Sequence, residues 1–230
     1  MTSTQPPSLI LNVAVLGLGM HMGAWRYRDG SPFDYTDVAF YREIAQVAEA
    51  GRLHAIFLAD TLAVAEENFE RPNLGAMDPM IVLGAIASAT SHLGLVATAS
   101  TTYNEPYNLA RRFSTLDHLS HGRASWNIVT TFIPDVAANF GTAELPNHDD
   151  RYERAQDFVD IVTRLWDSWE NEALIGDKAS GKFADAARVH ALNHRSAHYS
   201  VRGPLTLPRS PQGRPVLFQS GSSAPGRDLA

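Results

Sequence analysis

The chain has 230 residues, of which 44% are hydrophobic and 19% are charged, which is the composition of a globular domain with room for one substantial core. The formal net charge is −6 and the 19 basic residues are scattered along the chain, so the sequence predicts no nucleic-acid partner. The absence of cysteine excludes disulfide bonds, thiolate metal ligands and cysteine nucleophiles.

The N-terminal segment has the features of neither a secretion signal nor a membrane anchor. Its apolar run is not preceded by a basic region. No stretch of the chain approaches the roughly 20 apolar residues that a bilayer-spanning helix needs. We therefore expect a cytoplasmic protein without a membrane partner.

Short β-rich runs alternate with longer stretches of helical periodicity, the pattern of parallel βα units. The runs expected as strands are 9–16, 55–59, 93–99, 124–130 and 215–218. This order predicts an α/β fold of the (β/α)8 TIM-barrel kind. An eight-unit barrel typically takes about 250 residues, and only about five βα units are found here. We therefore expect an incomplete barrel, the N-terminal portion of a longer enzyme.

Amphipathic helices are expected between these strands, over 38–48, 80–89, 109–119 and 152–169. Thr36 is expected to cap the first helix and Gly51 to end it. Asp78 followed by Pro79 is typical of an N-cap with proline at the first helical position. The helix beginning near Tyr152 is predicted to be the longest.

Segment 171–213 interrupts this alternation. It is rich in Gly, Ser, Asp, His and Pro, and it is longer than an ordinary connection between a helix and a strand. We expect one barrel domain over 1–230, with 171–213 as an irregular insertion near the active-site face.

Polar side chains follow the expected strands where these end, and in a parallel barrel that face carries the active site. His21 follows the first strand, Asp60 follows the second, Thr98 lies near the end of the third and Asn127 lies in the fourth. One carboxylate among many hydroxyls and amides suits the binding of a flat heteroaromatic ligand better than it suits hydrolysis.

Two places in the sequence could bind a phosphate. The turn with Gly221, Ser222 and Ser223 lies between a strand and a beginning helix, where backbone N–H groups and hydroxyls can face an anion. His148 and Tyr152 stand four residues apart at the positive end of the longest helix. Both places also fit plain helix capping, with the aspartates after His148 as caps, and the two interpretations stay open.

The strongest rival enzyme class is a metal-dependent barrel hydrolase, suggested by nine histidines and the His-Asp-Asp cluster that begins at His148. Its spacing is wrong, because no H-x-H follows the first strand and His148 lies at a helix start rather than at a strand end. We expect no metal site.

Motifs along nearly the whole chain resemble those of the bacterial-luciferase-like flavin-dependent monooxygenases. They are HMGAWR at 21–26, FLAD at 57–60, DP at 78–79, STTYNEPYNLARRFSTLDHLSHGRASWNIVT at 100–130, NFG at 139–141, HDDRY at 148–152, LWDSWE at 165–170 and PVLFQSGSSAPGR at 215–227. Within that family they are similar to the group containing nitrilotriacetate monooxygenase component A, dibenzothiophene sulfone monooxygenase and long-chain alkane monooxygenase.

The resemblance implies a luciferase-like barrel that acts as an FMNH2-dependent monooxygenase in a two-component system. A separate NAD(P)H-dependent flavin reductase would supply reduced FMN, and one atom of the co-substrate O2 would enter a small organic substrate. It further implies a homo-oligomer for the full-length enzyme and His21 as the active-site histidine. The implied FMN contacts are Asp60, Thr98 and Asn127 near the ring and ribityl chain, and His148, Tyr152, Gly221, Ser222 and Ser223 near the phosphate.

One residue departs from the family pattern: Phe132 stands where the alkane-oxidising relative has a histidine shortly after the WN-VT motif. Two alternatives to an active FMN enzyme stay open. The chain could be a truncated, catalytically inactive flavin-binding fragment, or a deazaflavin-dependent oxidoreductase of the same superfamily. The HDDRY and SGSS motifs favour FMN over deazaflavin.

Overall fold

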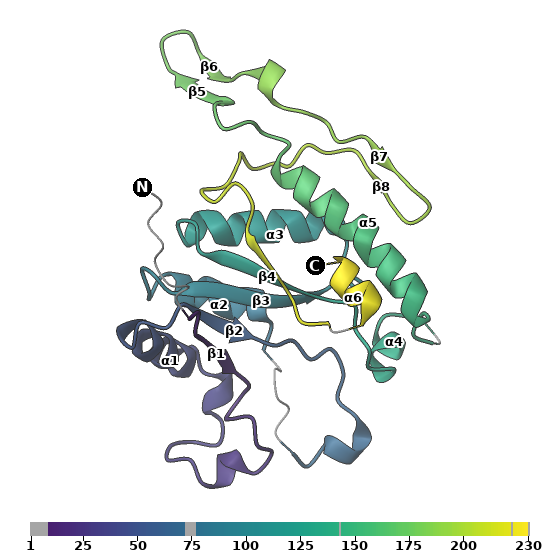
Figure 1. Ribbon diagram of the computed structural model, residues 1–230. Coiled ribbons are helices and arrows are strands. Elements are labelled where there is room, and N and C mark those ends of the chain that lie inside the picture. The colour runs from purple at the N-terminus through teal and green to yellow at the C-terminus, as the bar shows by residue number, and fades with distance from the viewer. Residues whose placement is uncertain (1–8, 72–76, 143, 222, 230) are drawn as a thin grey trace, which may run out of the picture.

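A computed structural model describes residues 9–71, 77–142, 144–221 and 223–229 of the chain. Its central sheet consists of five parallel strands in the order β1-β2-β3-β4-β9 (Figure 1). These strands are β1 (Asn12–Val15), β2 (Ala55–Leu58), β3 (Gly94–Ser100), β4 (Ala124–Val129) and β9 (Val216–Gln219). All five predicted strands are confirmed, β1 being shorter than expected, and the sheet order is that of consecutive βα units.

The helices of the described residues are α1 (Val38–Ala50), α2 (Pro79–Ala87), α3 (Pro106–Leu119), α4 (Asp135–Asn139), α5 (His148–Trp166) and α6 (Ala224–Leu229). The four predicted helices correspond to α1, α2, α3 and α5. Asp78 caps α2 as predicted, its carboxylate accepting hydrogen bonds from the N–H groups of Met80 and Ile81 at 2.8 and 3.2 Å. No helix among the described residues is long and apolar enough to cross a bilayer.

The structure places the N-caps of α1 and α5 next to the residues considered from the sequence: the cap predicted at Thr36 is wrong, and so is the alternative in which the aspartates cap α5. Asp37, not Thr36, caps α1, because its carboxylate accepts the N–H of Ala39 at 2.8 Å. Asn147 caps α5 by accepting the N–H of Asp150 at 2.9 Å, so the aspartates after His148 do not cap it.

The C-terminal end of α5 also differs from the prediction. The helix ends at Trp166, and Trp169 lies beyond it, where its indole N–H donates to the carbonyl of Leu205 at 2.9 Å. Trp169 was predicted as helical because its spacing matches the apolar stripe, but it packs against the segment that follows.

Side chains alternate between the two faces of the sheet, as strand geometry requires. One set of β3 and β4 side chains packs in the helix-covered core, where α1 contacts α2, α2 contacts α3 and α3 contacts α5. The centre of this core is Trp126 of β4, whose ring lies 5.7 Å from that of Phe113 and 5.9 Å from that of Phe158. Thr98, Ser125 and Asn127, which lie at alternate positions of these strands, are buried but polar.

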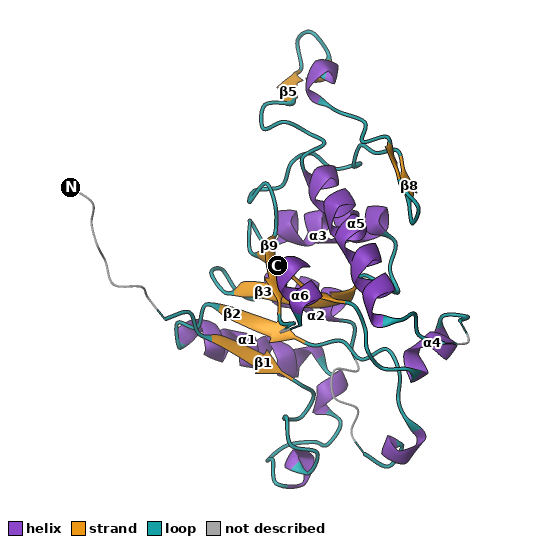
Figure 2. Cartoon of the chain, turned by 45° about the vertical axis from the view of Figure 1, so that its right-hand side comes forward, coloured by secondary structure: helices purple, strands orange, loops and turns teal. Residues whose placement is uncertain are grey.

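Segment 171–213 forms two antiparallel hairpins, β5 (Leu174–Asp177) with β6 (Lys182–Ala184) and β7 (His194–Arg195) with β8 (Ser200–Val201). The β5–β6 hairpin projects at the end of the molecule far from β1, in both Figure 1 and Figure 2. The remaining part runs along α3 and α5. Tyr107 of α3, for example, donates its hydroxyl to the carbonyl of Pro204 at 3.3 Å.

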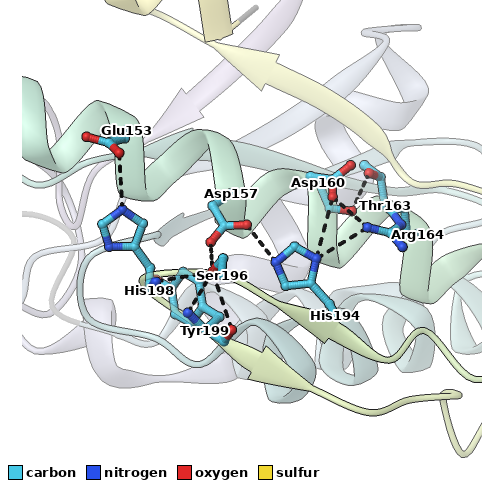
Figure 3. Close-up of polar contacts among 9 residues, drawn as sticks. All are labelled: Glu153, Asp157, Asp160, Thr163, Arg164, His194, Ser196, His198 and Tyr199. Atoms are coloured by element: carbon cyan, nitrogen blue, oxygen red, sulfur yellow. Dashed lines mark hydrogen bonds and ion pairs between the residues drawn. The ribbon is translucent and has the colours of Figure 1, made fainter.

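The β7–β8 hairpin is fixed to the outer side of α5 by a polar cluster (Figure 3). Nε2 of His194 lies 2.8 Å from a carboxylate oxygen of Asp157, and the hydroxyl of Ser196 donates to the other oxygen of that carboxylate. Farther along the helix, Nε2 of His198 lies 3.7 Å from the carboxylate of Glu153. The cluster therefore holds the hairpin on the helix layer.

Candidate functional site

A cavity of about 470 Å³ opens where β2, β3, β4 and β9 end. These are the carboxyl ends of parallel strands, where the loops of βα units meet. The cavity brings together five of the residues predicted from the sequence: Asp60, Thr98, Asn127, Tyr152 and Gly221. They come from β3, β4, α5 and the segments after β2 and β9, so the fold gathers residues far apart in the sequence.

Thr98 and Asn127 form the buried polar floor of the cavity. They are register partners on β3 and β4, and their side chains are 6% and 4% exposed. The amide of Asn127 donates to the hydroxyl of Thr98 at 3.0 Å. Because both groups are buried, this hydrogen bond fixes their orientation toward the space above the sheet.

Asp60 is the carboxylate of the site. Burial, reinforced by the negative charge of Asp78, raises the pKa of Asp60 from 3.8 to about 6. The backbone N–H of Thr61 and the charge of Arg112 oppose this shift but do not cancel it. A carboxyl group with this pKa can hold or release a proton near neutral pH, so Asp60 can donate a hydrogen bond when protonated and accept one when ionised.

A close approach of backbone and side chain shapes the other end of the cavity. A Cβ atom at Gly221 would lie 2.6 Å from Nε2 of Gln219 and 3.1 Å from the Tyr152 hydroxyl. A Cβ at Gly226 would lie 3.2 Å from the same hydroxyl. A side chain at either glycine would therefore press on Gln219 or Tyr152, and the backbone N–H of Gly221, which donates to Oε1 of Gln219 at 2.7 Å, lies close to the Tyr152 hydroxyl.

Hydroxyl groups also connect the loops that follow β3 and β4. The hydroxyls of Ser100 and Thr131 are 2.6 Å apart, and the hydroxyl of Thr102 donates to the carbonyl of Thr130 at 2.7 Å. Thr131 has a φ of +50°, a left-handed backbone conformation that a β-branched residue rarely adopts. The hydrogen bond to Ser100 holds the chain in this turn as it leaves β4.

Three predicted site residues do not line the cavity, and Ser222 lies outside the described residues. His21 is exposed in the loop after β1, where its Nδ1 accepts the N–H of Gly23 at 3.1 Å. The His148 ring lies 4.8 Å from that of Tyr152, and its Nδ1 lies 3.0 Å from the carboxylate of Asp149. The Ser223 hydroxyl accepts the N–H of Gly226 at 3.2 Å, at the start of α6.

Ser100, Thr131 and Gln219 also line the cavity. The sequence places all three among the residues at the strand ends, but it gives none of them an individual FMN contact. A signal for Ser100 was present, because it follows Thr98 by two residues and therefore points to the same face of β3. Thr131 and Gln219 directly follow the fourth and fifth expected strands, but the left-handed turn at Thr131 and the contact of Gln219 with Gly221 cannot be read from that position. Within the described residues, no group of three or more histidine and acidic side chains could hold a metal ion.

A sequence-family model described as luciferase-like monooxygenase matches residues 20–230 of the chain. The chain belongs to this family. The parallel sheet, with its cavity at the carboxyl ends of the strands, is thus part of a luciferase-like TIM barrel.

Two curated relatives show how close the similarity is. The chain is 46% identical over 221 residues to N-acetyl-S-(2-succino)cysteine monooxygenase of Bacillus subtilis, covering 96% of this chain and 50% of the relative. It is 44% identical over 223 residues to nitrilotriacetate monooxygenase component A of Aminobacter aminovorans, covering 92% of this chain and 49% of the relative. The chain thus spans about half the length of the curated relatives it matches.

Two solved structures also superpose on nearly the whole of this chain, which covers about half of each of them. A crystal structure of a long-chain alkane monooxygenase superposes with a TM-score of 0.91 at 35% identity, covering 98% of this chain and 54% of that one. A riboflavin lyase, solved with modified FMN and riboflavin, superposes with a TM-score of 0.85 at 38% identity and covers 95% of this chain and 51% of that one. The predicted partial luciferase-like barrel is confirmed.

Proposed function

We propose that this chain forms the FMN-binding part of an FMNH2-dependent monooxygenase, which inserts one atom of O2 into a small organic substrate. The observation that carries the proposal is the cavity in which Asp60, Thr98, Asn127, Tyr152 and Gly221 meet at the carboxyl end of the sheet. The names of the similar proteins support it, since two are monooxygenases and a third was solved with modified FMN. A separate NAD(P)H-dependent flavin reductase fits the description of one relative as component A.

The residues present suit a flavin. A flat ring with polar edges needs hydrogen-bonding groups at the bottom of an otherwise enclosed site, and the Thr98–Asn127 pair offers them. The phosphate end needs hydrogen-bond donors close to a backbone without side chains, and the Tyr152 hydroxyl beside the glycine turn at Gly221 supports this position for it. In this proposal His148, Ser222 and Ser223 also contact the FMN phosphate. His21 is the active-site histidine of the proposed enzyme.

At a site held by Thr98, Asn127 and Tyr152, reduced FMN would supply the electrons for the reduction of O2, so that one oxygen atom could enter the substrate and the other leave as water. The residues of the chain would position the flavin, keep water out of the cavity and hold a proton. Thr98 and Asn127 orient the ring edge, while the apolar parts of the cavity limit the entry of water. Asp60, whose pKa is about 6, can hold a proton at the edge of the same space.

The decisive experiment is a titration of the purified chain with FMN under anaerobic conditions, with and without dithionite, followed by calorimetry. We expect reduced FMN to bind more tightly than oxidised FMN. Asn127→Ala and Tyr152→Phe should each weaken binding by about tenfold, because a hydrogen bond to the flavin is lost. Ser196→Ala, in the hairpin outside the cavity, is the matched control and should leave the affinity unchanged.

Three results would contradict the proposal. They are tight zinc binding without flavin affinity, binding of a deazaflavin in preference to FMN, and equal affinities for the three variants and the unsubstituted chain. Oxygen consumption in the presence of a flavin reductase then separates an oxygenating enzyme from a fragment that binds flavin and does no chemistry.

A further inference from the structure

The cavity has a second side of different chemistry from its polar floor. Leu62, Phe132, Ile133 and Val136 line it with apolar groups, and we call these four residues the apolar wall. Phe132 is 80% exposed and Ile133 is 37% exposed. A large aromatic side chain left in solvent at the mouth of a cavity is unusual for packing, and it is typical of a surface that binds a ligand.

The apolar wall is held in place from both of its ends. The amide of Asn139, at the end of α4, donates to the carbonyl of Leu62 at 2.9 Å and ties the loop after β2 to that helix. Val136 anchors α4 with a side chain that is 1% exposed. At the other end, the Ser100–Thr131 hydroxyl contact fixes the left-handed turn immediately before Phe132. The wall is therefore a preformed surface.

Charge distinguishes the ligands that such a wall accepts. Among the described residues that line the cavity, Asp60 is the sole charged side chain, with no lysine, arginine or histidine. A carboxylate entering this space would lose its hydration without meeting a cation, and it would approach a second carboxylate. An uncharged apolar molecule would instead exchange water for contact with Phe132 and its neighbours.

We propose that the apolar wall is the substrate-binding side of the cavity and that it takes an uncharged apolar or aromatic molecule rather than a polycarboxylate. This rests on the proposed function, in which FMN occupies the polar floor and the substrate lies opposite. Phe132 is the specificity-determining residue of the wall, because it presents the largest exposed apolar surface at the mouth.

Binding can be measured without turnover. The purified chain is titrated by calorimetry with dibenzothiophene sulfone, as the uncharged aromatic probe, and with nitrilotriacetate, as the polycarboxylate probe, both with and without FMN. We expect the aromatic probe to bind and nitrilotriacetate not to bind. Phe132→Ala should lower the affinity for the aromatic probe by about tenfold, because the substitution removes an aromatic side chain from the contact.

Two further variants make the test specific. Phe183→Ala removes an aromatic ring that is 72% exposed on β6, outside the cavity, and should leave probe binding unchanged. Phe132→Leu keeps an apolar side chain and should retain most of the affinity. Nitrilotriacetate binding more tightly than the aromatic probe, or equal losses for Phe132→Ala and Phe183→Ala, would overturn the proposal.

The FMN titration separates this inference from the function on which it rests. Phe132→Ala should bind FMN as the unsubstituted chain does, because Phe132 lies on the wall and not on the polar floor. If the unsubstituted chain binds no FMN, the proposed function fails. If the unsubstituted chain binds FMN but does not bind the aromatic probe, only the assignment of the apolar wall as the substrate side fails.

Discussion

A single carboxyl group makes the stability of this chain depend on pH in an unusual direction. Most paired carboxylates in folded proteins have a lowered pKa and stabilise the fold as pH rises. Asp60 does the opposite, because burial and the charge of Asp78 raise its pKa from 3.8 to about 6. The folded chain therefore holds the proton of Asp60 over a pH range in which the unfolded chain has already released it.

The sign of the effect follows from linkage. Below about pH 4 the carboxyl is protonated in both states and contributes nothing, whereas between about pH 4 and 6 the unfolded state ionises first and folding stability falls. Asp60→Asn should remove this loss, so that the variant gains stability over the unsubstituted chain as pH rises through that window. Because Asp60 is partly exposed, solvent screening reduces the effect of its pKa shift on the free energy of unfolding. We expect the stability difference between Asp60→Asn and the unsubstituted chain to be about 1 kcal/mol at neutral pH.

Urea unfolding at a series of pH values checks this prediction, with Asp37→Asn at the exposed cap of α1 as the comparison variant. Parallel stability curves for Asp60→Asn and the unsubstituted chain would show that Asp60 does not titrate as described.

The residues of the cavity also show which site positions a sequence can reveal. Asp60, Thr98 and Asn127 were predicted because they lie on or directly after strands, and parallel strands end at one edge of the sheet. His21 was singled out because it follows the first strand and His148 because it stands at a helix start, but neither residue lines the cavity. Spacing along the sequence does not determine how the chain turns at such positions, so their roles remain predictions.

At the level of elements, the β7–β8 hairpin depends on one carboxylate of α5. Asp157 is 16% exposed in its side chain and contacts both His194 and Ser196 (Figure 3). Replacing Asp157 by alanine leaves the half-buried His194 and the exposed Ser196 of the hairpin without this carboxylate. We expect a loss of about 1–3 kcal/mol, concentrated in the hairpin.

Hydrogen exchange measured by mass spectrometry tests this element directly. In Asp157→Ala, the amides of 194–201 should exchange faster, while those of β3 and β4 keep their protection. Asp149→Ala, an exposed carboxylate near the start of α5, is the matched control. Faster exchange throughout the sheet would mean that the hairpin and the core unfold as one unit.

The sequence predicts the strands of the central sheet better than the strands of segment 171–213. The five parallel strands are continuous apolar runs between helical stretches, so their existence was clear although the start of β1 was not. The strands of 171–213 are two to four residues long and mostly exposed, and they carry no periodic pattern. The β7–β8 hairpin is held by polar contacts with α5, and β5 pairs with β6, and neither feature shows as a periodic pattern in the sequence.

For the whole molecule, the two edges of the parallel sheet decide how the chain behaves in solution. β1 and β9 are the edge strands. Val216 and Leu217 of β9 are 49% and 42% exposed, and Leu9, Ile10 and Leu11 before β1 are 49–75% exposed. Apolar side chains beside unpaired backbone N–H and C=O groups favour pairing between chains.

We expect this 230-residue chain to associate in a concentration-dependent way or to unfold at low temperature with weak cooperativity. Each 100 Å² of apolar surface left in water forfeits about 2.5 kcal/mol, which is large beside the roughly 5–15 kcal/mol that stabilises a typical domain. Leu217→Lys places a charge on the β9 edge and should reduce association, whereas Ile81→Lys, at a 72% exposed position of α2, should not. Size-exclusion chromatography over a concentration series, with a thermal melt, measures both effects. A monodisperse monomer with a sharp transition would show that the β1 and β9 edges are stable in water without a partner strand.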